Sequence, residues 1–151
     1  GYSVTLPATW SWVKMERDAP LRATRDGPQL QSISFLFREH GDAFPNTGQR
    51  SSAEALPEAL AQLFVAEFRS EIGVGEVEVL NSAPVTISER EGFRVELAWR
   101  QANGLRIRAI AYGVATTRGL YLSYYRAPVL NYYGHHEGEF EQTMQTFRLP
   151  A

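Results

Sequence analysis

The 151-residue chain contains no cysteine. This absence excludes disulfide frameworks, thiolate metal sites and cysteine nucleophiles together. The sequence also has no run of 18 or more apolar residues, so it contains no candidate membrane-spanning helix. Its formal net charge is −2, with a pI near 5.9. The chain therefore lacks the basic excess with which proteins hold nucleic acid, and we exclude nucleic acid as a partner.

The signatures of common enzyme classes are missing too. There is no GxxxxGK[ST] phosphate-binding loop and no Gly-x-Ser-x-Gly nucleophile elbow. The Gly73-Val74-Gly75 sequence precedes a strand-like run instead of a helix, which excludes a dinucleotide-binding fingerprint. We therefore expect a protein that is not an enzyme, with no catalytic, cofactor-binding or metal-binding residue to assign.

What is present is the composition of a globular protein, 44% hydrophobic and 21% charged. The length corresponds to one domain, and we expect residues 1–151 to form it. A folded chain of this size buries about 68–70% of the surface exposed when unfolded, which is enough for a core. Because the first residue is Gly1 and strand-like sequence follows at once, we expect a processed or truncated product.

The first half of the chain predicts strands and then a helix. Residues 2–6 and 10–15 are expected to be extended, and Ile33, Phe35 and Phe37 repeat with the period of two that is typical of a strand. Residues 41–52 are rich in Gly, Pro, Asn and Ser, which predicts a loop. A helix beginning at Pro57 and ending near Gly73 follows, because one helical stripe collects the apolar residues Leu56, Leu60, Leu63, Phe64 and Phe68.

The second half predicts five strands, over residues 76–80, 85–88, 93–101, 105–114 and 120–126, and then a helix over residues 131–145. Side-chain alternation also predicts the hairpin between residues 93–101 and 105–114. A three-residue loop, with Gly104 left-handed, pairs Trp99 with Ile107 and keeps one face apolar, whereas a two-residue turn mixes charged and core residues. The order of elements predicts an α+β fold, an antiparallel sheet with helices packed on it.

These residues resemble the PsbP-like superfamily, which includes PsbP, Ran-binding nucleotide-release proteins and DcrB-type bacterial envelope proteins. The matching pieces are Tyr-Ser-Val-x-Leu-Pro-x-x-Trp at residues 2–10, the helix over 56–68, the strand Glu-Gly-Phe-Arg-Val-Glu-Leu at 91–97 with its hairpin partner, and the closing Thr-Phe-Arg at 146–148. The resemblance covers nearly the whole chain and implies an α/β/α sandwich with a central antiparallel sheet. It also implies a secreted or lipid-anchored envelope protein, and it transfers no activity.

Two groups of residues carry an alternative function, the binding of a metal ion, an anion or another small ligand. The first is His135, His136 and Glu139, although adjacent histidines on a helix point about 100° apart and a zinc site needs at least three ligands. The second is the polar face of the predicted hairpin, which carries Arg94, Arg100, Arg106 and Arg108. The competing interpretation of this face is that Glu96 and acidic residues of the last helix neutralise it.

Aromatic residues suggest a third surface. Five tyrosines lie between residues 121 and 133, and an aromatic rim over residues 125–133 would suit a binding surface. Trp10 and Trp12 are expected to pack in the interior instead of binding a ligand.

The leading hypothesis is a non-enzymatic binding or scaffolding domain of the bacterial cell envelope, periplasmic or lipid-anchored. Its expected partner is another envelope protein, which it would contact through the sheet edge, residues 125–133 or the loop over residues 38–52.

Overall fold

The computed structural model describes residues 2–13, 21–27, 30–72 and 76–149. In these residues seven strands form one antiparallel sheet in the order β1-β2-β3-β7-β6-β5-β4. The elements, in chain order, are β1 (Ser11–Val13), β2 (Leu21–Thr24), β3 (Ser32–Glu39), α1 (Pro57–Ile72), β4 (Val77–Ile87), β5 (Arg90–Arg100), β6 (Arg106–Ala115), β7 (Gly119–Pro128), the π-helical turn η1 (Val129–Tyr133) and α2 (Gly134–Gln145).

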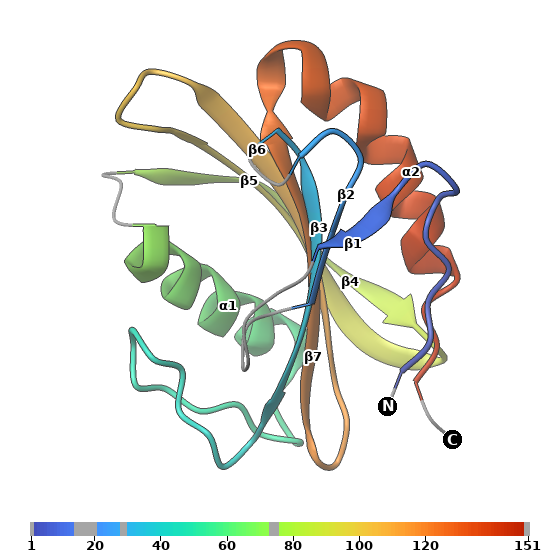
Figure 1. Cartoon of the computed structure of the whole chain (residues 1–151). Coiled ribbons are helices and arrows are strands. Elements are labelled where there is room, and N and C mark those ends of the chain that lie inside the picture. Colours follow the sequence, from blue (N-terminus) through green and yellow to red (C-terminus); the bar gives the residue numbers. More distant parts are fainter. Residues whose placement is uncertain (1, 14–20, 28–29, 73–75, 150–151) are drawn as a thin grey trace.

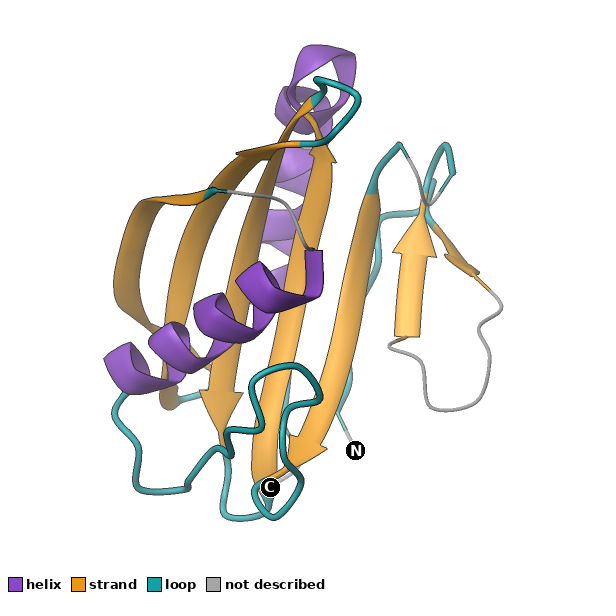
Figure 2. Ribbon diagram, turned by 90° about the vertical axis from the view of Figure 1, so that its left-hand side faces the viewer, coloured by secondary structure: helices purple, strands orange, loops and turns teal. Residues whose placement is uncertain are grey.

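The two long helices lie on opposite sides of the sheet, with α1 crossing one face and α2 the other (Figure 1). On the first face, α1 contacts β4, β5 and β6, and Figure 2 shows it lying across these strands. The two ends of the described chain are joined by an isolated bridge between Ser3 and Arg148. Because β3 pairs with β7, the first strands are joined to the last ones, and the sheet is continuous.

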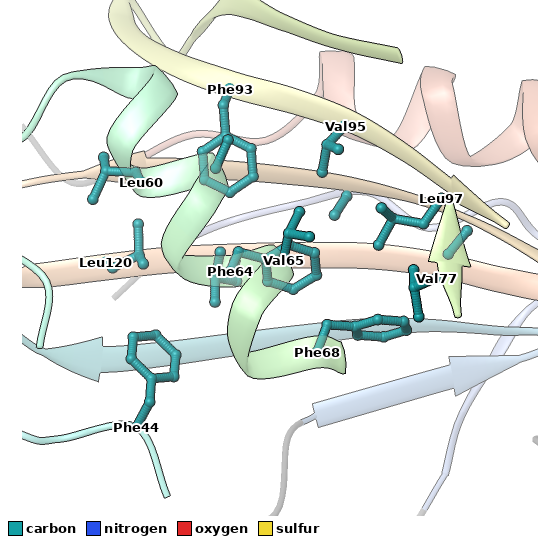
Figure 3. Close-up of a cluster of buried hydrophobic side chains, with 14 of the residues drawn as sticks. Phe44, Leu60, Phe64, Val65, Phe68, Val77, Phe93, Val95, Leu97 and Leu120 are labelled. Carbon is teal, nitrogen blue, oxygen red and sulfur yellow. The ribbon is translucent and has the colours of Figure 1, made fainter. Parts of the chain in front are cut away.

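Each face of the sheet has its own hydrophobic cluster. The cluster under α1 is drawn in Figure 3 and includes Leu60, Phe64, Phe68, Phe93, Val95, Leu97, Trp99 and Leu120. The cluster under α2 includes Trp10, Ile33, Phe35, Ile110, Tyr125, Tyr133, Phe140 and Phe147. The strands contribute alternate residues to the two clusters because successive side chains of a strand point to opposite faces.

Several predictions of local structure are confirmed. Helix α1 begins at Pro57, and β3 includes the alternating residues Ile33, Phe35 and Phe37. The β5–β6 hairpin pairs Trp99 with Ile107, and Gly104 has a φ of 86°, as the alternation requires. The antiparallel sheet with helices packed on it is confirmed as well.

Other boundaries were predicted wrongly. The segments 76–80 and 85–88 belong to one strand, β4, because a register shift between Val79 and Asn81 lets the chain stay paired with β5 through the irregular sequence between them. Residues 2–6 form no strand beyond the bridge at Ser3. Strand β7 continues through Pro128, and β2 was not predicted. The predicted helix end at Gly73, and residues 14 and 15 of the predicted strand over 10–15, lie outside the described residues.

No helix in the described ranges is long and apolar enough to cross a membrane.

Candidate functional site

The hairpin face predicted to be rich in arginine lies on the α2 side of the sheet, where carboxylates neutralise half of it. Arg94 lies 2.8 Å from Glu96 and 2.6 Å from Glu141 of α2, and Arg108 lies 3.0 Å from Glu96. The hydroxyl of Tyr112 donates to Glu141. Partial burial lowers the pKa of Arg94, but the hydrogen bonds that Arg94 donates to Glu141 and Glu96 outweigh burial and raise its pKa above the usual value. The network fastens α2 to the sheet.

The other two arginines of this face lie at the end of the hairpin. Arg100 donates to the carbonyl of Gly104 at 3.0 Å, and Arg106 is exposed opposite Arg100. The four arginines therefore do not converge on one anion site. The interpretation that Glu96 and acidic residues of the last helix neutralise this face is correct for Arg94, whereas Arg108, among the described residues, pairs with Glu96 of β5 alone.

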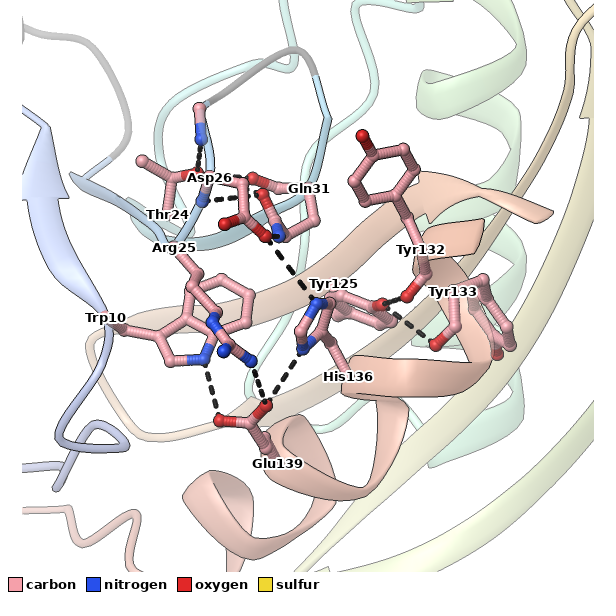
Figure 4. A network of polar contacts seen from close by, with 11 residues as sticks. Trp10, Thr24, Arg25, Asp26, Gln31, Tyr125, Tyr132, Tyr133, His136 and Glu139 are labelled. Atoms are coloured by element: carbon pink, nitrogen blue, oxygen red, sulfur yellow. Dashed lines mark hydrogen bonds and ion pairs between the residues drawn. The ribbon is translucent and has the colours of Figure 1, made fainter. Parts of the chain in front are cut away.

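The histidine cluster is a structural contact between α2 and the β1–β2 end of the sheet (Figure 4). His136, which is buried, donates from Nδ1 to Glu139 at 2.9 Å, and its Nε2 lies 3.8 Å from Asp26. The indole N–H of Trp10 donates to Glu139 at 3.0 Å. His135 is exposed, and the centre of its ring lies 6.3 Å from the centre of the His136 ring. Within the described part of the chain, no three His, Asp or Glu side chains are grouped to hold a metal ion.

The aromatic segment over residues 125–133 is mostly interior, which makes the predicted aromatic rim wrong. Tyr125 and Tyr133 are buried and stack on each other, and Tyr125 also stacks on Phe140. The Tyr125 hydroxyl donates to the carbonyl of Tyr133 at 3.0 Å, and burial raises the pKa of Tyr125. The π-helical turn exposes aliphatic side chains instead, above all Leu130, which is 73% exposed.

The two N-terminal tryptophans have different surroundings. Trp10 is buried in the cluster under α2, which confirms the expected packing role. The centres of the Trp12 and Phe35 rings lie 5.9 Å apart, but Trp12 remains 47% exposed, so only part of its side chain is interior.

The loop between β3 and α1 is held near its start and in its middle. Near its start, His40 contacts the hydroxyl of Ser51 at 2.7 Å and the carbonyl of Thr116 at 2.8 Å. In its middle, Phe44 is buried against the core under α1. These contacts hold the loop beside α1 in one arrangement.

A buried carboxylate of α1 holds the same loop. Glu67 is 6% exposed and accepts hydrogen bonds from the backbone N–H of Asn46 at 2.7 Å, from the Asn46 amide at 2.9 Å and from the backbone N–H of Thr47 at 3.0 Å. Burial raises the pKa of Glu67, but these donors outweigh it and lower the pKa below its usual value.

Between the loop, α1 and the strands β3 and β7 lies a groove with a volume of about 260 Å³. Its loop wall belongs to residues 38–52, which were a predicted contact surface, but a groove was not predicted here. The sequence does carry one signal for the groove, because alternation along β3 places Arg38 on the same face as Leu36, which packs against the core under α1. A charged side chain that points to an apolar face is costly to bury unless it has a polar partner there.

Comparison with solved structures places this arrangement among known folds. The chain superposes on cyanobacterial PsbP (CyanoP) from Synechocystis sp. PCC 6803 with a TM-score of 0.69 and 13% sequence identity, over 99% of this chain and 87% of that one. The chain has a PsbP-like fold. LpqN, involved in cell envelope biogenesis of Mycobacterium tuberculosis, superposes with a TM-score of 0.67 and 8% identity, over 99% of this chain and 83% of that one.

A protein of Bacteroides thetaiotaomicron also shares the PsbP-like fold, with a TM-score of 0.62 and 10% identity. This chain is covered to 99%, and that longer chain to 45%. No protein-family model and no curated protein matches the sequence. At these identities the likeness establishes the fold alone.

Proposed function

We propose that this chain is a non-enzymatic binding domain of the bacterial cell envelope, periplasmic or lipid-anchored, whose partner is another envelope protein. Its PsbP-like fold serves as a rigid α/β/α sandwich that presents one binding edge. LpqN, which has a similar fold, is involved in cell envelope biogenesis, and this supports the location. The candidate polar clusters join parts of the chain to each other, which supports binding through another surface.

The observation that carries the proposal is the exposure of β4, the last strand at one edge of the sheet. Residues 78–84 are all exposed, and they include Val79 and Leu80, which are 40% and 42% exposed. An edge strand presents unpaired backbone N–H and C=O groups, and proteins bind extended segments by adding a strand to such an edge.

The irregularities of β4 favour a specific partner. The register shift between Val79 and Asn81, together with Pro84, breaks the regular pattern of backbone groups along the edge. Bulges and prolines on edge strands are devices that prevent indiscriminate pairing of sheets. We therefore propose that β4 accepts one short extended segment of a partner, next to the apolar side chains of Val79 and Leu80.

Site-specific photo-crosslinking in cells of the source organism tests this function. A photoreactive amino acid replaces Leu80 in one variant. In the control variant it replaces Leu130, which is more exposed than Leu80 and lies far from β4 in the sequence. We expect one discrete envelope-protein adduct from position 80 and none from position 130. An excess of the unmodified domain should suppress the adduct, whereas an excess of the Leu80→Arg variant should not. The proposal is wrong if both positions give the same adducts, or if position 80 gives none.

A further inference from the structure

We infer that the groove between α1, the β3–α1 loop and strands β3 and β7 is a binding site for a small monocarboxylate with an apolar body. This inference is independent of the proposed function, because none of the groove residues belongs to β4. It rests on the chemistry of the walls and on one arginine within them.

The walls of the groove are apolar and come from three parts of the chain. The strands contribute Leu36, Leu122 and Tyr124, helix α1 contributes Phe64 and Phe68, and the loop contributes Phe44. Figure 3 shows Phe44 pointing from the loop toward the cluster under α1. Concave apolar sites with a few polar groups are the usual form of small-molecule sites.

Among the described residues, Arg38 is the one cationic side chain that lines the groove. Its Nη1 donates to the carbonyl of Ala43 at 3.1 Å, and its guanidinium lies 5.1 Å from the centre of the Phe44 ring. Its Nε is buried and has no hydrogen-bond partner among the described residues, and within the same residues no carboxylate forms an ion pair with it. A buried donor without a partner is costly, and a guanidinium matches a carboxylate in shape and charge.

Glu67 also lines the groove, and its charge has to be accounted for. Three N–H donors from Asn46 and Thr47 already point at its two oxygens, so it is satisfied within the protein. By fixing the loop, Glu67 keeps Phe44 in the wall of the groove. The site is therefore built before any ligand arrives, which lowers the entropic cost of binding.

The volume sets the size of the ligand. Cavities of about 150 Å³ bind benzene, so a groove of about 260 Å³ corresponds to about ten non-hydrogen atoms. Octanoate has this size, one carboxylate and an apolar chain, and it is the probe that we choose.

The experiment compares ligands on the unaltered chain by isothermal titration calorimetry. Octanoate, octanamide and octylamine share the alkyl chain and differ in the charge of the head group. We expect saturable 1:1 binding of octanoate, binding of octanamide at least tenfold weaker, and no measurable binding of octylamine. Equal affinity for octanoate and octanamide would overturn the inference, as would the absence of saturable octanoate binding at millimolar concentration.

Two matched variants locate the site. Arg38→Gln removes the charge and should weaken octanoate binding at least tenfold. Arg118→Gln is the control, because the Arg118 side chain is 74% exposed and lies outside the groove, and its effect should stay below twofold. Equal effects of the two variants would place the carboxylate elsewhere and contradict the inference. If Arg38→Gln does not fold, the comparison of the three ligands on the unaltered chain still tests the inference.

Discussion

Gly113 of β6 lies opposite Phe93 of β5, and the Phe93 ring occupies the space that a side chain would need. A Cβ at position 113 would lie 2.2 Å from a carbon of this buried ring. We expect Gly113→Ala to lower the free energy of unfolding by about 1–3 kcal/mol, because a tightly packed core tolerates little added volume.

Urea denaturation measures this effect. Gly138→Ala is the control, because it makes the same substitution at a position with free space for the added methyl group. A Cβ at Gly138, inside α2, would have no atom within 4 Å. Alanine is the better helix former, so this variant should gain about 0.5–1 kcal/mol. Equal destabilisation by both variants would contradict the packing argument.

Glu67 makes stability depend on pH in a defined direction. Its folded pKa is lowered, so folding favours the ionised form. The resulting stabilisation is present above the ordinary glutamate pKa of about 4.3 and is lost as the pH falls through the lowered folded pKa. Glu67→Gln should cost about 1–3 kcal/mol at pH 7, because buried donors lose a charged acceptor.

Urea denaturation at a series of pH values, from pH 7 down to the lowest pH at which the chain still folds, tests this prediction. The difference in stability between the unaltered chain and Glu67→Gln should shrink as the carboxylate becomes protonated. Glu91→Gln, at an exposed position of β5, should change stability by less than about 0.5 kcal/mol at any pH. A constant difference across the pH range would show that the Glu67 charge does not fasten the loop.

At the scale of elements, local patterns predicted what depends on neighbours in sequence. Alternation determined the β5–β6 register because a shift of one residue would place Trp99 opposite Arg108 and Ile107 opposite Arg100, which mixes charged and core residues. The pairing of β3 with β7 has no such local signal. For the same reason the contacts of His136 with Asp26, and of Glu67 with Asn46, could not be predicted: they depend on how distant elements meet.

The contact between Trp10 and Glu139 joins the segment before β1 to α2, and a double-mutant cycle measures it. Trp10→Phe keeps an aromatic ring but loses the N–H donor, and Glu139→Gln removes the charge of the acceptor. We expect a coupling of about 1 kcal/mol, since the hydrogen bond is partly buried and charge-assisted. The control cycle pairs Trp12→Phe with Glu139→Gln and should show no coupling, because Trp12 packs on Phe35. Equal coupling in both cycles would refute the contact.

For the whole molecule, we propose that both faces of the sheet belong to one cooperative domain. The clusters under α1 and α2 draw on alternate residues of the same strands, so neither cluster can separate without losing the strands it shares with the other. On β6, for example, Ala109 belongs to the first cluster and Ile110 to the second.

Two tryptophans report on the two clusters separately, because Trp99 lies in the cluster under α1 and Trp10 in the cluster under α2. One variant keeps Trp99 and has Trp10 and Trp12 replaced by Phe. The other variant keeps Trp10 and has Trp12 and Trp99 replaced by Phe. In each variant, we expect the fluorescence transition in urea to coincide with the far-ultraviolet circular dichroism transition of the same protein. If one reporter changes at a lower urea concentration than the circular dichroism signal, that face unfolds independently and the chain is not one cooperative domain.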